Sequence, residues 1–267
     1  MATTESPAVV RQIDISEMVT LNRSFEVEIY STTFFFFVYF LTRFLYSRLS
    51  KEYIKLAKND KIEYNSRVVS NVNAIISTLG SSYVLFVEAH SWYQNPFQGN
   101  SFASYFFLKF IWGYFLYDTL LVCYYRNLFD YGTLFHHVLG LYLYNIGIVC
   151  GNCHFVLISY IFTEITTPFV NFRWILYQTN RKDGLLYMIN GLCLALGFLI
   201  VRVIYIPLSI GYQLYDKYPL SFALPEFVWY GTYFGFVLIN LLNMFWAFLI
   251  WRGLIRLAFS SNKQKSK

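Results

Sequence analysis

The chain has 267 residues, of which 57% are apolar and only 13% are charged, about half the charged share of an ordinary soluble domain. Aromatic residues make up 22% of the chain, which excludes an intrinsically disordered protein. Four cysteines are too few for a secreted disulfide scaffold of this length. The composition therefore predicts an integral membrane protein with several membrane spans and no large soluble domain.

Seven apolar stretches are each long enough to cross a bilayer as a helix, which takes about 20 residues. They lack the strict alternation of apolar and polar residues that is typical of transmembrane β-strands. We therefore expect an all-α polytopic membrane protein with seven transmembrane helices. In chain order the stretches are residues 27–46, 68–88, 104–125, 133–150, 154–173, 185–208 and 226–250.

Lysine and arginine residues gather behind the odd-numbered stretches, in residues 43–67, at Arg126, in 173–182 and in 252–267. Cytosolic loops carry such an excess, so the pattern predicts a lumenal or extracellular N-terminus and a cytosolic C-terminus. The net charge of +6 is then a sign of topology. No basic patch or nucleic-acid motif accompanies it, so we expect no nucleic-acid partner. A further interpretation of residues 51–61 is contact with anionic lipids of the cytosolic leaflet.

Several ionisable and amide side chains fall inside the predicted spans, where such groups are costly and therefore indicate function. Most of them fall in the cytosolic half of the membrane, and they come from different helices. We expect them to line a polar chamber that opens toward the cytosol. The candidates are Asp118, His136, His137, Glu164, Asn190 and Asn243, with Arg202 alone nearer the lumen.

The adjacent His136 and His137 are the first candidates for chemistry, because histidine transfers protons near neutral pH. Neighbours on a helix point about 100° apart, so one imidazole can act as base or nucleophile while the other braces a neighbour. Asp118 can hold an imidazole in one tautomer, as a carboxylate does in a hydrolase triad. The alternative is that the histidines lie among lipid headgroups and that Asp118 has a structural partner. The residues alone leave both interpretations open.

Metal chemistry has little support in the sequence, since the chain has four histidines and a membrane di-iron enzyme needs many in spaced boxes. Thr133 stands where a His-x-x-His-His box would need its first histidine. We predict no metal and no cofactor. Cys150 and Cys153 form a C-x-x-C on the lumenal side, which is either a disulfide or a pair of packed thiols.

An ordered set of short motifs runs through the second half of the chain. It consists of Lys61–Ser70, Asp118, Phe135-His136-His137, Glu164–Trp174, Asn190-Gly191, Phe198–Arg202 and Asn243–Trp246. This set resembles the TLC domain, which ceramide synthases share with translocation-associated membrane proteins and several lipid-homeostasis proteins. The resemblance covers residues 60–255. It divides the chain into a lumenal segment 1–26, a first helix with a basic cytosolic loop 27–59, the TLC domain 60–255 and a basic cytosolic tail 256–267.

The resemblance implies six helices in a ring around a lipid-sized cavity, with the first helix outside. It also implies a role in membrane lipid homeostasis, by binding or modifying an acyl lipid in that cavity. In ceramide synthases the paired histidines transfer an acyl chain from acyl-CoA to a sphingoid amine, and His136 and His137 match that pair. This chain departs from them in two places: residues 159–164 lack a His-Asp, and Asn73 replaces a common histidine. The sequence therefore leaves open whether the protein is an acyltransferase.

Three further expectations concern the cellular location of the protein, its functional class and its ligand. Lys263 and Lys265 form a Lys-x-Lys-x-x pattern at the C-terminus, which is either a retrieval signal for the endoplasmic reticulum membrane or a solvated basic tail. Seven spans with an outer N-terminus also occur in receptors, but an Asn-Pro-x-x-Tyr and an Asp-Arg-Tyr are missing from the expected spans. We therefore expect a membrane lipid or acyl-CoA as partner, its polar end near the paired histidines and its tail toward the lumen. The oligomeric state is left open.

Overall fold

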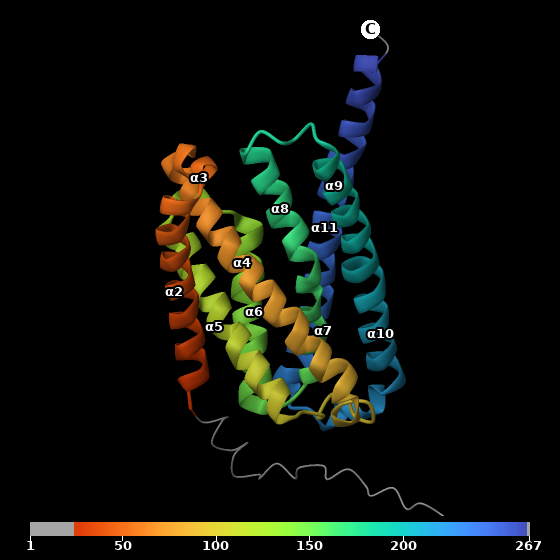
Figure 1. Ribbon diagram of the computed structural model, residues 1–267. Coiled ribbons are helices and arrows are strands. Elements are labelled where there is room, and N and C mark those ends of the chain that lie inside the picture. Colours follow the sequence, from red (N-terminus) through yellow and green to blue (C-terminus); the bar gives the residue numbers. More distant parts are fainter. Residues whose placement is uncertain (1–23, 266–267) are drawn as a thin grey trace, which may run out of the picture.

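The computed structural model describes residues 24–265, and side chains as far as Arg256 (Figure 1). The predicted N-terminal segment and the candidate retrieval signal at Lys263 and Lys265 therefore lie outside the part whose side chains are described. The seven predicted spans are confirmed, because seven helical segments are long and apolar enough to cross a membrane. No strand occurs within residues 24–265.

Five of the spans are continuous or nearly so, and two are interrupted. The continuous ones are α2 (Glu26–Leu49), α5 (Phe102–Tyr124), α6 (Tyr131–Cys150) and α11 (Glu226–Lys265), while α4 (Lys58–Ser82) ends in a π-helical turn η1 (Tyr83–Val87). The fifth span is α7 (His154–Phe162) and α8 (Thr167–Gln178), joined by a 3-10 segment η4 (Thr163–Thr166). The sixth span is α9 (Leu185–Gly197) and α10 (Ile206–Asp216), joined by a π-helix η5 (Phe198–Tyr205). Short elements complete the chain: α3 (Lys51–Lys55), η2 (Ala89–Ser91), η3 (Arg126–Leu128) and η6 (Tyr218–Ala223).

The second helix is longer than its apolar stretch, because α4 begins at Lys58 and the stretch begins at residue 68. Asn65, Val69 and Asn73 are spaced by four residues and are all buried, so one face of the polar first turns packs on the bundle. Residues at this spacing lie on one side of a helix, and this packing extends the helix where hydropathy predicts a loop.

Six helical spans form a closed ring in the order α4, α5, α6, α11, α9–α10, α7–α8 and back to α4. Helix α2 lies outside this ring against α5 and α4, at the left edge of Figure 1. The predicted ring of six with one outer helix is thereby confirmed.

The outer helix α2 is fastened to α5 by buried polar contacts. Lys109 Nζ lies 3.0 Å from Glu28 Oε1, and the two side chains are 1% and 5% exposed. Thr32 donates a hydrogen bond to the carbonyl oxygen of Gly113 over 2.9 Å. A Cβ on Gly113 would lie 2.6 Å from the Glu28 carbonyl oxygen, so only glycine permits this close approach.

The two ends of the ring differ in charge. Helix α3, η3, the loop 179–184 and the last turns of α11 lie together at the end drawn uppermost in Figure 1. We call this the basic end, because nine lysines and arginines gather there: Lys51, Lys55, Lys58, Lys61, Arg126, Arg181, Lys182, Arg252 and Arg256. The other end, where α4 ends and α5 begins, is called the opposite end.

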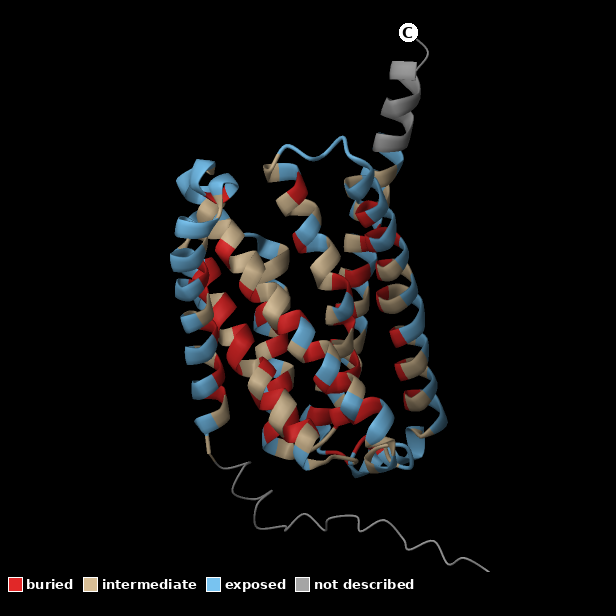
Figure 2. Ribbon diagram, in the orientation of Figure 1, coloured by how far each residue is buried: buried red, intermediate tan, exposed pale blue. Residues whose placement is uncertain are grey.

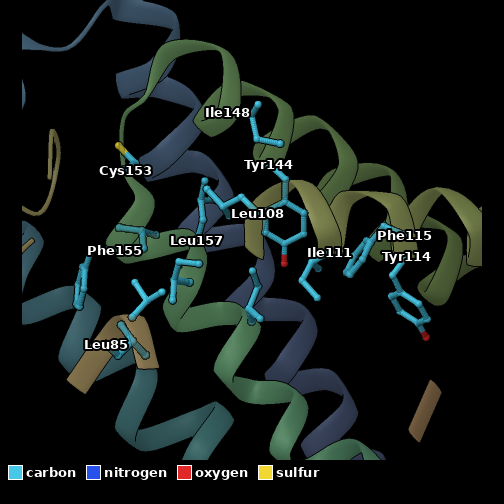
Figure 3. Packing of buried hydrophobic residues seen from close by; sticks show 14 of the residues in the cluster. Leu85, Leu108, Ile111, Tyr114, Phe115, Tyr144, Ile148, Cys153, Phe155 and Leu157 are labelled. Atoms are coloured by element: carbon cyan, nitrogen blue, oxygen red, sulfur yellow. The ribbon is translucent and has the colours of Figure 1, made fainter. Parts of the chain in front are cut away.

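Helix α7 fills the ring at the opposite end. It packs against α4, α5 and α6, and seven of its nine residues are buried. Figure 2 shows buried residues concentrated in this half, and Figure 3 shows side chains such as Leu108, Tyr144 and Leu157 converging on one interior region. Close packing of this kind leaves little free space. We call this part of the bundle the packed half.

A buried histidine belongs to the packed half. His154 is 1% exposed, its Nδ1 lies 2.7 Å from Ser104 Oγ, and its Nε2 lies 3.1 Å from the carbonyl oxygen of Gly147. Because a carbonyl only accepts hydrogen bonds, Nε2 carries the proton and Nδ1 accepts from the serine hydroxyl. Both ring nitrogens are therefore occupied, and this histidine joins α5, α6 and α7.

Candidate functional site

A chamber of about 590 Å³ lies inside the ring in the half nearer the basic end. This volume falls within the range of about 300–1,000 Å³ that is typical of small-molecule sites. Exposed residues of the η3–α6 connection, including Asn127 and Asp130, line it and mark its mouth at the basic end. The structure thus has a polar chamber that opens at the basic end.

Three acid–base pairs line the chamber wall. Glu63 and Arg67 of α4 are 2.6 Å apart, Asp118 of α5 and His137 of α6 are 3.4 Å apart, and Glu164 of η4 and Arg202 of η5 are 3.4 Å apart. All six residues line the chamber. Asp130 also lines it, but it caps α6 by accepting hydrogen bonds from the N–H and hydroxyl of Thr133, over 2.8 Å and 3.0 Å. The charges of the wall are therefore largely compensated within the protein.

Asp118 and His137 form the middle pair, and both are more than nine-tenths buried. Asp118 lies six residues before the end of α5, or about 9 Å along the helix axis. Its Oδ2 faces His137 Nε2, so the carboxylate favours the tautomer with the proton on Nε2. The tautomer is assigned from this contact. Asp118 therefore lies beside His137, and its role in orienting that imidazole stays a prediction.

His136 differs from its neighbour, because no acid lies within ion-pair distance of it among the described side chains. Its ring packs against Phe115 at 5.4 Å and Trp246 at 5.5 Å between centroids. Its Nδ1 is buried without a hydrogen-bond partner. His136 is thus the histidine of the chamber wall without a charged partner, while the Nδ1 of His137 is likewise buried without a hydrogen-bond partner.

Arg202 corrects one expectation, because the sequence places it alone and nearer the lumen. It lies on the chamber wall instead, with Glu164. Its Nε donates to Thr166 Oγ1 over 2.8 Å and one terminal nitrogen donates to Thr167 Oγ1 over 3.2 Å. The cause is the interruption of both helices: η4 and η5 face each other, and depth counted along a regular helix no longer holds there.

Asn190 and Asn243 do not line the chamber. Asn190 is buried and donates to the carbonyl oxygen of Phe169 over 2.9 Å, which ties α9 to α8. Asn243 lines a small space of about 30 Å³ on the far side of Phe115 and His136, with Tyr144 among its other walls. Of the seven predicted site residues, the chamber brings together Asp118, His136, His137, Glu164 and Arg202.

Two residues that the site prediction omitted stand at the chamber mouth, Glu63 and Arg67. Arg67 donates to Asn171 Oδ1 over 3.2 Å and lies over the Trp174 ring at 4.9 Å, so it also joins α4 to α8. Glu63 and Arg67 have the i,i+4 spacing of a helical ion pair. This spacing indicates a helical ion pair in the sequence, but both residues precede the apolar stretch that begins at residue 68, so hydropathy alone places them in a loop.

The two cysteines of the C-x-x-C are free thiols in the structure. Cys153 is buried, and its sulfur accepts a hydrogen bond from Thr232 Oγ1 over 3.1 Å. Burial raises the pKa of the Cys153 thiol to about 11. The structure therefore supports packed thiols. Within the described residues no group of three or more His, Cys, Asp or Glu gathers as a metal site.

Comparison with known proteins gives one consistent relationship. The family model described as TLC domain matches residues 63–252. TLC domain-containing protein 4 A of Dictyostelium discoideum is 31% identical over 232 residues, which cover 85% of this chain and 87% of that protein. TLC domain-containing protein 4 of Homo sapiens is 25% identical over 240 residues, with 88% and 90% covered. Topoisomerase I damage affected protein 4 of Saccharomyces cerevisiae is 24% identical over 203 residues, with 74% and 70% covered.

Proposed function

The chain belongs to the TLC domain family, and on that premise we propose that it contributes to membrane lipid homeostasis by holding an acyl lipid in its chamber. The observation that carries this proposal is the chamber itself, a space of about 590 Å³ with compensated charges and one unpaired imidazole. Polar groups at membrane depth have to face a partner or water. A lipid offers such groups a polar end and offers the rest of the wall an apolar chain.

The basic end faces the cytosol in this proposal, because lysine and arginine mark cytosolic loops. The chamber then opens to the cytosol, and the N-terminus is lumenal. We assign the protein to the endoplasmic reticulum membrane through Lys263 and Lys265. Protease access to tags at both ends of the chain in sealed microsomes tests the orientation. Replacing both lysines by serine tests the location, and an unchanged location contradicts the retrieval signal.

An acyltransferase of the ceramide synthase kind is the second candidate, and the arrangement of the two histidines favours it. His137 is held by Asp118, whereas His136 has no charged partner and lines the same chamber. In such a reaction the amine nitrogen attacks the thioester carbonyl of acyl-CoA. His136 takes the proton from the amine and returns it to the departing thiolate, so that an amide and free CoA result.

The deciding experiment compares cellular lipids and co-purified lipids for the wild type, His136→Ala, His137→Ala and Val138→Ala. Val138 is on the same helix but is 53% exposed on its outer face, so Val138→Ala is the matched control. The binding role predicts that both histidine variants lose co-purified acyl lipid while no product disappears. The enzyme predicts loss of one amide-linked lipid in both histidine variants. Unchanged lipid profiles and unchanged co-purified lipid in both histidine variants would overturn both roles.

A further inference from the structure

The chamber wall is divided into a polar side and an apolar side. The polar side is formed by the acid–base pairs on α4, α5, α6, η4 and η5. The apolar side is formed by α9, the first residue of η5 and α11. Its residues are Leu194, Phe198, Trp246, Leu249 and Ile250. A wall divided in this way fits a molecule with one polar end and one apolar end.

The apolar side also belongs to a separate hydrophobic cluster. The main core joins α2, α4, α5, α6, α7, α10 and the first turns of α11. Leu194, Phe198 and Ala247 form a second and much smaller buried cluster, with Trp246 and Ile250 packed against it. The chamber lies between the two clusters. The walls on its two sides are therefore not held together by one continuous core.

Helix α11 is fastened at one half only. Near the opposite end, Thr232 donates to Cys153 Sγ, Asn240 donates to the Tyr160 hydroxyl over 2.9 Å, and a Cβ on Gly235 would lie 2.7 Å from Leu143. From residue 241 to 256, no described side chain of α11 makes a hydrogen bond or ion pair with another helix. The Trp246 ring contacts the His136 ring of α6 there, with 5.5 Å between centroids.

Other neighbouring spans around the chamber are joined by polar bonds. Arg67 and Asn171 join α4 to α8, Asn190 and the Phe169 carbonyl join α9 to α8, and Arg202 joins η5 to η4. Apolar contacts alone hold the part of α11 that borders the chamber. Segments with few fixed contacts open at low free-energy cost.

The chamber meets the outer surface of the bundle beside this part of α11. Phe129, just before α6, is 41% exposed, and Leu249 of α11 is 42% exposed, yet both line the chamber. Leu249 lies three residues beyond Trp246, or about 4.5 Å toward the basic end, and it precedes the first basic residue of α11, Arg252. The two side chains that border the chamber here are therefore apolar, and Leu249 lies about one helical turn before Arg252.

In contrast, little space is left for an acyl chain between the chamber and the opposite end. Beyond Phe115 and His136 only about 30 Å³ remains, and Tyr144 and Leu157 border it. This space is about the volume of one water molecule. The sequence-based expectation that the tail points toward the lumen therefore does not fit the structure.

We propose that the acyl tail of the bound lipid leaves the chamber sideways between α6 and α11, past Trp246 and Leu249. The polar end lies near His136 and the Asp118–His137 pair, and the chain lies in the leaflet at the basic end. The ligand is accordingly an amphiphile that keeps its chain in that leaflet while its polar end enters the protein. This inference rests on the proposed lipid-holding function and adds where each end of the lipid lies.

Photolabelling of the full-length protein in cells tests the placement. Cells are fed a clickable fatty acid that carries a diazirine either near the carboxyl end or near the methyl end, and labelled peptides are mapped. The methyl-end probe is expected to label residues 249–250 of α11, and the carboxyl-end probe is expected to label the first turns of α6 beside His136 and His137. Label from that probe on Tyr144, Leu157 or Ile239 would overturn the sideways path while leaving lipid binding intact. Absence of saturable label in the chamber from both probes would overturn the path together with the proposed function.

Two leucine-to-tryptophan variants of α11 provide the second arm. Leu249→Trp fills the opening and is expected to lower saturable labelling by both probes several-fold. Leu241→Trp makes the same change at a residue that is 57% exposed and does not line the chamber, so labelling should stay at the wild-type level. Both variants are checked for a monodisperse elution profile. Equal labelling of the two well-folded variants would contradict the opening at Leu249.

Discussion

Two histidine environments show how the halves of this bundle differ. In the packed half, His154 is 1% exposed and both of its ring nitrogens have partners on neighbouring helices. In the chamber half, His136 lines an open space and its Nδ1 has no partner. A histidine at membrane depth thus joins neighbouring helices in one half, whereas in the other half it lines the chamber and keeps a ring nitrogen without a partner. The presence of a histidine in a span does not decide between these roles, whereas its partners do.

The largest effect is expected from Lys109→Met in the packed half. The change leaves the Glu28 carboxylate buried without a partner, and breaking a buried pair in this way costs about 3–5 kcal/mol of unfolding free energy. Thermal unfolding of the purified protein in detergent measures the loss. The double variant Lys109→Met/Glu28→Met should recover most of it, and a stable single variant would show that α2 is not fastened through this pair.

His154→Ala is expected to have the next largest effect. It leaves the Gly147 carbonyl without its side-chain donor and removes the partner of Ser104, so we expect a loss of about 1–3 kcal/mol. The same unfolding assay applies, with His90→Ala as control because His90 is exposed. If both variants unfold alike, His154 does not have a structural role.

His136→Ala should change stability by less than about 1 kcal/mol, because the side chain faces existing space and has no hydrogen bond to lose. Its effect should appear in retained acyl lipid instead. Measuring unfolding and co-purified lipid on one preparation separates the two effects. A loss of stability as large as that of His154→Ala would remove the distinction between the halves.

Cys153 gives the smallest and most local test of the packed half. A thiol with a pKa of about 11 has almost no thiolate at neutral pH. As long as the pH is below the pKa, the thiolate fraction rises about tenfold for each unit by which the pH increases. We expect iodoacetamide to leave Cys153 unmodified in the native protein at neutral pH and to modify it after unfolding. A variant that retains only Cys153 makes the measurement specific. Rapid native modification at neutral pH would show that this end of the bundle is open.

The seven spans and the general location of the site follow from the sequence because each depends on one property of the residues. Hydropathy over a helical length identifies a span, and the cost of a polar group in lipid identifies Asp118, His136 and His137 as cavity residues. Which charged residues pair with each other depends on how the helices pack in three dimensions, and the sequence alone does not predict it. The partnership of Arg202 with Glu164 depends on two interrupted helices, and the role of Glu63 and Arg67 depends on where α4 begins. Asn190 was predicted to line the cavity but does not, because its buried amide donates a hydrogen bond to the Phe169 carbonyl of a neighbouring helix instead.

The π-helical segment η5 has a consequence for how chains of this family can be compared residue by residue. A π-helix contains about one residue more per turn than an α-helix and commonly corresponds to an inserted residue. Deleting one residue from 198–201 would restore the regular register and turn Arg202 relative to Asn190 by about 100°. The contact of Asn190 with the Phe169 carbonyl and the contact of Arg202 with Glu164 could then not both be kept. A relative with a one-residue gap in this segment should therefore lack one of the two contacts, even where both residues are present.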